Sequence, residues 1–243
     1  MKHLLAVLFC FLQHSLGDQI TLKVHPLSED SKSTLIWFNS STYDRWAQQL
    51  DNFLEVYRNP TLTDGREENL VTCNYNKYPS TDSVCNIRPE EMKPCTASNF
   101  FGYKSGTPCV FIELEKVLGW KPKYFSSGKS LPKTMPKNLK EKILETTEVN
   151  LKMWETIWLS CDGETPADKE MIGPIQILPQ PGFPGYFFPY IGQPGYLNPV
   201  VAVHFERPLG GLVINIVCKA WAPGIIHDMN KPLGVARFEL LID

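Results

Sequence analysis

The chain has 243 residues, of which 43% are hydrophobic, and its 24 basic and 26 acidic residues give a formal net charge of −2. This length allows one domain with a full hydrophobic core, or two small domains. The near-neutral charge gives no indication of nucleic-acid binding.

The first residues have the pattern of a secretory signal. Lys2 and His3 precede an apolar run over residues 4–12, and small residues precede a cleavage site before Asp18. A membrane-spanning helix needs about 20 apolar residues, and this run is shorter. We therefore expect residues 1–17 to be a cleaved signal, with a short signal-anchor as the alternative, and the rest of the chain to be extracellular.

Residues 18–38 mix polar and apolar side chains without a clear period, and they are predicted to form an extended stalk before a domain over residues 39–243. Asn39, in Asn-Ser-Ser, begins the only Asn-x-Ser/Thr sequence of the chain in which x is not proline. In a secreted protein this sequence is a glycosylation site. We expect Asn39 to carry a glycan.

An amphipathic helix is predicted directly after this site. Ser40 or Ser41 is the expected N-cap, and Asn59-Pro60 ends the helix. Its apolar residues recur at spacings of three and four and form one stripe: Tyr43, Trp46, Ala47, Leu50, Phe53, Leu54 and Tyr57. The stripe is predicted to pack on the core rather than to bind a partner.

Short strands are predicted further along the chain. Residues 109–117 alternate, with Glu113 and Glu115 on the polar face. A short helix over 137–149 and a strand over 155–161 follow. Three more strands are expected over 200–205, 212–219 and 235–242, with a Pro-Leu-Gly-Gly turn between the first two. Such strands predict an immunoglobulin-like β-sandwich with a flanking amphipathic helix.

Seven cysteines occur, of which Cys10 lies in the expected signal. The other six imply three disulfides, with 15 connectivities. Sequential pairing is the simplest: Cys73 with Cys85, Cys95 with Cys109, and Cys161 with Cys218. No pair has the spacing of a zinc site, so we expect no metal and no cofactor.

Catalysis is not expected. The sequence has no Gly-x-Ser-x-Gly or His-Glu-x-x-His motif. Beyond the signal only His25, His204 and His227 remain as histidines, and bridged cysteines leave no thiol nucleophile. Residues 116–142 hold eight lysines and one acidic residue. This stretch is predicted to be a solvated face, with anionic glycans or lipid headgroups as alternative partners.

The stretch between Cys161 and Cys218 is rich in proline and aromatic residues. Eight prolines fall between Pro166 and Pro199, so no helix or inner strand continues through it. Six aromatic rings lie over residues 183–196. Such an apolar area packs either on the domain's own core or on another protein.

Ordered motifs make the chain similar to one family over about residues 37–243. They are Cys85 with Cys95, Gly102-Tyr103-x-x-Gly106-x-Pro108-Cys109, Val117-Leu118-Gly119-Trp120-x-Pro122, Pro181-Gly182-Phe183, Phe187-Phe188-Pro189-Tyr190, Tyr196-Leu197-x-Pro199, Val201-Ala202-Val203-x-Phe205, Cys218-Lys219-Ala220 and Gly234-x-x-Arg237-Phe238. In this order they resemble the β subunits of the sodium/potassium-transporting ATPase and of its proton/potassium relative.

This resemblance implies a non-catalytic glycoprotein that assists the folding and membrane delivery of the pump's catalytic α subunit, a P-type ATPase, and modulates its ion affinity. It also implies sequential disulfide pairing. The α-subunit contacts that it implies come from the aromatic segment, at Phe187, Phe188, Pro189, Tyr190 and Tyr196.

The chain departs from the family in two places. The family favours Tyr-Tyr-Pro-Tyr-Tyr-Gly-Lys where this chain has Phe-Phe-Pro-Tyr-Ile-Gly-Gln from Phe187 to Gln193, and the lost hydroxyls remove hydrogen-bond donors. Family members also begin with a cytoplasmic tail and an uncleaved transmembrane helix, whereas residues 1–17 have the pattern of a signal. A secreted interaction module, with contacts to cell-surface proteins or glycans, is therefore the alternative function.

Overall fold

A computed structural model describes residues 20–28, 30 and 33–243. The expected signal over residues 1–17 lies outside the described residues. Among the described residues, no helix combines the length and the apolar character that crossing a membrane requires.

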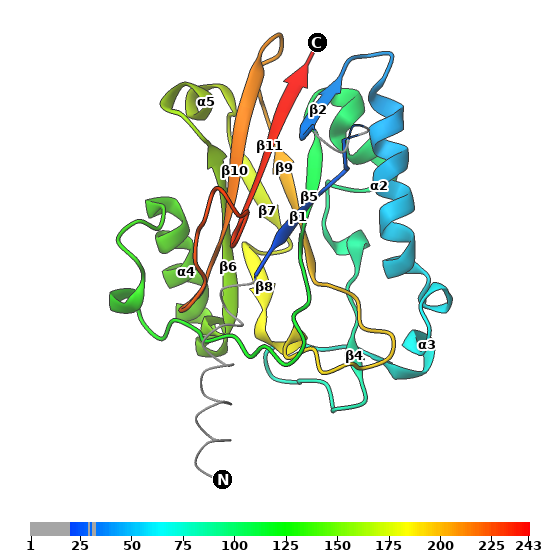
Figure 1. The fold of residues 1–243 in the computed structure, drawn as a ribbon, viewed down its shortest axis with the longest axis vertical. Coiled ribbons are helices and arrows are strands. Elements are labelled where there is room, and N and C mark those ends of the chain that lie inside the picture. The colour runs from blue at the N-terminus through cyan, green and yellow to red at the C-terminus, as the bar shows by residue number, and fades with distance from the viewer. Residues whose placement is uncertain (1–19, 29, 31–32) are drawn as a thin grey trace.

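Two β-sheets packed face to face form the centre of the molecule (Figure 1). The four-stranded sheet is antiparallel, in the order β1 (Leu22–His25), β5 (Cys109–Leu114), β9 (Val200–Phe205) and β7 (Ile175–Leu178). The five-stranded sheet has the order β2 (Leu35–Phe38), β11 (Val235–Ile242), β10 (Val213–Trp221), β6 (Thr156–Gly163) and β8 (Gly182–Pro184). A separate parallel pair joins β3 (Leu70–Val71) and β4 (Val84–Cys85).

Helices connect and cover these strands. The α-helices are α2 (Tyr43–Arg58), α3 (Arg66–Asn69), α4 (Lys137–Val149) and α5 (Pro166–Met171). Shorter 3-10 segments are η2 (Pro60–Leu62), η3 (Pro89–Glu91), η4 (Ala97–Ser105), η5 (Gly128–Ser130), η6 (Leu151–Trp154) and η7 (Gly185–Phe187). The predicted β-sandwich with a flanking amphipathic helix and three disulfides is confirmed.

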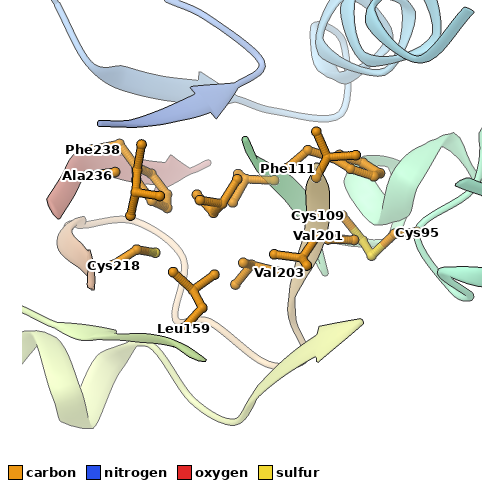
Figure 2. Close-up of a cluster of buried hydrophobic side chains, with 14 of the residues drawn as sticks. Cys95, Cys109, Phe111, Leu159, Val201, Val203, Cys218, Ala236 and Phe238 are labelled. Atoms are coloured by element: carbon orange, nitrogen blue, oxygen red, sulfur yellow. A yellow bond between two sulfur atoms is a disulfide. The ribbon is translucent and has the colours of Figure 1, made fainter. Parts of the chain in front are cut away.

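The main core lies between the two sheets. Val201, Val203 and Phe205 of β9 face Phe238 of β11 and Leu159 of β6, and Figure 2 shows side chains of both sheets meeting there. All of these side chains are buried. The alternation of residues along each strand places every second side chain in this layer.

The stripe of α2 packs on the outer face of the four-stranded sheet. Trp46, Leu50 and Leu54 are buried, and the rings of Phe53 and Phe111 lie 6.5 Å apart. The predicted core role of this helix is therefore confirmed. The helix starts after Thr42, not after one of the two serines, because the turn from Asn39 already bonds the amide of Ser41 to the Asn39 side chain at 2.8 Å.

A second, smaller core covers the opposite face. α4 and the segment before it bury apolar residues against Trp158 and Trp221 of the five-stranded sheet: Phe125, Leu131, Met135, Leu139 and Ile143. These residues alternate with the lysines of the basic stretch. The same stretch therefore has an apolar side on the sheet and a charged side in solvent.

The segment expected to be a stalk is part of both sheets. β1 pairs antiparallel with β5, and β2 pairs parallel with β11. Ile20, Leu22, Ile36 and Phe38 are buried. This differs from the expectation because the partners of these short strands lie far away in the sequence, where local patterning cannot indicate them.

One expectation about the strands also needs correction. Glu113 does not face solvent, because α2 covers the outer face of β5 and leaves the residue 9% exposed. The Pro-Leu-Gly-Gly segment connects β9 to β10, as predicted, and these two strands lie in different sheets. Strand β11 has the predicted bounds, and β9 as well.

The structure contains three disulfides, and they join Cys73 to Cys85, Cys95 to Cys109, and Cys161 to Cys218. Cys161 and Cys218 lie directly opposite each other on β6 and β10. The third bond therefore links neighbouring strands of one sheet and does not connect the two sheets.

Candidate partner-binding surface

The aromatic segment lies at one end of the molecule. It follows β8 through η7 and runs as a loop over residues 188–199 to β9, near α3 and β4 in the lower part of Figure 1. The C-terminus lies at the opposite end. The loop is therefore a terminal feature of the sandwich, carried on two ordered strands.

The predicted contact residues differ in how far they reach solvent. Phe187 and Phe188 are half-buried and pack against the main core, with the Phe188 ring 5.5 Å from that of Trp120. Pro189 and Tyr190 are half-buried, and Tyr196 is buried. The two phenylalanines thus serve largely as anchors of the loop.

Tyr190 is held by the segment that contains Gly119. The amide of Gly119 donates to the Tyr190 carbonyl at 2.7 Å, and Leu118 and Tyr190 form a parallel β-bridge. The Lys116 Nζ lies 4.8 Å from the centre of the Tyr190 ring. The centres of the Tyr190 and Tyr196 rings are also 4.8 Å apart. A cation over the ring face and a second ring fix the orientation of Tyr190.

Two exposed apolar side chains flank Tyr190, and neither is among the contact residues predicted from the sequence. Leu118 is 65% exposed and Ile191 is 49% exposed. Together with Lys116 and Tyr190 they make up what we call the Tyr190 surface. The sequence shows an apolar residue, Leu118, directly before Gly119. Only the β-bridge to Tyr190 brings Leu118 beside the loop.

A small pocket adjoins this surface. It has a volume of about 230 Å³ and lies between residues 78–85 and residues 186–197. Ile191 and Tyr78 are among its lining side chains, and both are exposed. An apolar side chain of a partner that entered the pocket would contact both loops at once.

The part of the loop around Gly195 is held against α3. The Arg66 side chain is fully buried, and its Nη1 donates to the Gly195 carbonyl at 2.8 Å. Gly195 has φ of 79°, and a Cβ there would lie 2.3 Å from the Arg66 Cα. Only glycine fits this approach. Burial lowers the pKa of Arg66 from its usual value.

A buried polar network supports the loop where it enters β9. The Tyr57 hydroxyl donates to the Asn198 carbonyl at 3.0 Å, and the Asn198 side chain donates to Glu113. Burial alone would raise the pKa of Glu113, but hydrogen bonds from His25 and Asn198 outweigh it, so that the pKa is lowered. The ionised carboxylate is thus the form that holds this network.

Asn39 lies at the other end of the molecule, in the turn before α2. Its side-chain oxygen accepts from the Ser41 amide, so the side-chain nitrogen is the group that would carry a glycan. His25 pairs with Glu113 and His227 bonds to the Ala220 carbonyl. Across the described residues, no group of three His, Cys, Asp or Glu side chains is arranged to hold a metal ion.

These features define a disulfide-stabilised, two-sheet β-sandwich domain with an anchored aromatic loop. A family model described as the sodium/potassium ATPase beta chain matches residues 18–239. The chain therefore belongs to the sodium/potassium ATPase β-chain family, whose members are non-catalytic subunits of that pump.

Individual relatives agree with this assignment. The chain is 45% identical to the sodium/potassium-transporting ATPase subunit beta-2 of Drosophila melanogaster over 221 residues, which is 90% of this chain and 68% of the relative. It is 34% identical to subunit beta-1 of the same organism over 96% of this chain and 74% of the relative. A probable subunit beta-3 of Caenorhabditis briggsae is 32% identical over 89% of this chain and 64% of its own length.

Proposed function

We propose that this chain associates with the α subunit of a sodium/potassium-transporting P-type ATPase at the plasma membrane and supports its folding, delivery and ion affinity. The observation that supports the proposal most directly is the Tyr190 surface. It exposes Leu118 and Ile191 beside a tyrosine whose carbonyl and ring are both fixed. Exposed apolar side chains on a rigid frame are typical of binding surfaces.

We propose further that the five residues implied by the resemblance all contribute to the contact, some by touching the partner and some by supporting the loop. Tyr190 and Pro189 would touch the partner, whereas Phe187, Phe188 and Tyr196 would hold the loop in shape. Ile191, where the family favours tyrosine, makes this contact more apolar. Affinity would then depend on buried apolar area more than on hydrogen bonds.

The first prediction concerns this surface. Leu118→Asp and Ile191→Asp should each weaken the complex with a co-expressed α subunit at least about tenfold, because a charge would be buried at the contact. Leu209→Asp is the matched control, because Leu209 is 53% exposed in the loop at the opposite end of the sandwich. The measurement is the amount of α subunit that co-purifies with the chain from detergent.

Thermal unfolding of each purified variant separates binding from folding. We expect the three variants to unfold within a few degrees of the unchanged protein, since all three positions are exposed. If the Leu118 and Ile191 variants keep the α subunit as well as Leu209→Asp does, the Tyr190 surface is not the contact.

Cleavage before Asp18 is a separate proposal, and so is glycosylation of Asn39. N-terminal sequencing of protein from the medium and from membranes tests the first. A mass shift on deglycosylation, absent in Asn39→Gln, tests the second.

A further inference from the structure

A cleft opens between the two sheets on the side of the sandwich that carries α4. β7 is the outer strand of the four-stranded sheet, and β6 becomes the outer edge of the other sheet beyond its short pairing with β8. Asn138, Leu139 and Lys142 of α4 form a third wall. The cleft has a volume of about 620 Å³.

The edge of β7 that faces this cleft has free backbone groups. The Glu206 amide donates to the Pro174 carbonyl at 3.0 Å, which makes these two residues a hydrogen-bonded pair of the ladder with β9. Bonding alternates along an antiparallel strand. Ile175 and Ile177 therefore direct their N–H and C=O groups away from β9, and no residue in the described part of the chain pairs with them there.

On the facing edge of β6, two of the three amides that point away from β10 are already bonded. The Leu159 amide donates to the Pro181 carbonyl at 3.0 Å, and the Gly163 amide donates to the Asp162 side chain at 2.8 Å. An open strand edge is a template for another strand. The edge of β7 is thus the one on which a further strand would form.

We infer that this cleft binds an extended peptide segment of a partner protein, which adds to β7 as an outer strand. Peptides bind to free sheet edges in this way through their main chain, with pockets for alternate side chains. Every second side chain of the segment would point between the sheets, toward Leu159 and Cys161. The segment that fits best has small apolar residues at alternate positions.

The shape of the cleft favours a short segment over a whole domain. Pro179 directly follows β7 and lacks an amide donor, so the free edge ends there. α4 overhangs the opening and would block a second sheet, whereas a single extended chain fits a volume of this size. The cleft shares no lining residue with the pocket beside Tyr190, so this inference does not rest on the proposed function.

Amide exchange on the whole, disulfide-bonded protein tests the free edge. In the absence of peptide, the amides of Ile175 and Ile177 should exchange faster than those of Gln176 and Leu178, which bond to β9. The probe is the blocked peptide acetyl-Thr-Val-Thr-Val-Thr-amide. Its addition should slow exchange at Ile175 and Ile177 at least about tenfold and leave Gln176 and Leu178 unchanged.

N-methylated probes provide a control that leaves the protein untouched. One peptide has methyl groups on the amides of its two valines, and the other on those of its three threonines. Because one edge of an added strand pairs with β7, one peptide should lose binding at least about tenfold while the other keeps it. Equal binding of the two would contradict strand addition.

A matched pair of protein variants locates the site. Asn138→Trp narrows the mouth of the cleft and should abolish binding, whereas Lys137→Trp, on the same helix but outside the cleft, should retain it. Absence of binding at about 1 mM of the unmethylated probe would overturn the inference. A concentration-dependent dimer that Asn138→Trp removes would also overturn it, because the occupant would then be a second copy.

Discussion

Single residues decide how the aromatic loop over residues 188–199 keeps its shape. Gly195 and Gly192 both have positive φ, at 79° and 94°, but their surroundings differ. A Cβ at Gly195 would collide with Arg66, whereas one at Gly192 would meet nothing within 4 Å. Substituting the two glycines therefore distinguishes the free-energy cost of a left-handed backbone from that of a steric clash.

The corresponding prediction compares alanine at the two positions. Gly192→Ala should lower the free energy of unfolding by about 1–2 kcal/mol, which is the cost of the conformation alone. Gly195→Ala should lower it further, by at least about 1 kcal/mol more, because the loop must leave α3. Urea denaturation of both variants measures the difference. Equal losses would mean that the contact with Arg66 contributes nothing.

Individual elements differ in how well the sequence predicts them. α2 and β11 were predicted because a long apolar stripe and a regular alternation are local signals. The strands β1 and β2 were missed because they are four residues long and pair with β5 and β11, far along the chain. Glu113 was misplaced for a related reason, since only the packing of α2 reveals that the outer face of β5 is covered.

The candidate site shows the same division. The aromatic segment and its proline-rich character were evident from composition, and the family resemblance indicated which loop is the candidate contact. Which rings face the core and which face solvent depends on the segment around Leu118, about 70 residues earlier in the chain, and on Arg66. Contacts of that separation leave no trace in local patterning.

The short helix α5 supplies a prediction about pH. Hydrogen bonds from Thr165 and Asn215 overcome the effect of burial and lower the pKa of Asp168 to about 2. The carboxylate therefore stabilises the fold above the unfolded pKa of about 3.9, and this contribution is lost as the pH falls toward 2.

Asp168→Asn should reduce the free energy of unfolding by about 1.5–3 kcal/mol at pH 7, since it weakens charge-assisted hydrogen bonds. The difference from the unchanged protein should shrink between pH 4 and pH 2. Denaturation curves across this range provide the measurement. A difference that stays constant down to pH 2 would show that the charge of Asp168 has no part in the effect.

At the scale of the whole molecule, the disulfides close loops of very different length. Cys95 and Cys109 are 14 residues apart, and Cys161 and Cys218 are 57 apart. In the loop-entropy model the stabilisation grows with loop length. The third bond should therefore contribute more, although it joins strands that are already neighbours.

Replacing both Cys161 and Cys218 by alanine should cost about 4 kcal/mol, against about 3 kcal/mol for the same change at Cys95 and Cys109. Chemical denaturation of the two double variants gives the comparison. The reverse order would indicate that strain or residual structure in the unfolded chain outweighs loop entropy.

The parallel pairing of β2 with β11 has a consequence for how the chain is made. Leu35 is opposite Glu239, so this edge of the five-stranded sheet forms only after some 200 further residues have left the ribosome. The loops of 12 and 14 residues between paired cysteines close much earlier. Pairings of such high contact order form slowly. Until then the edge of β10 that later pairs with β11 stays open to pairing with other chains.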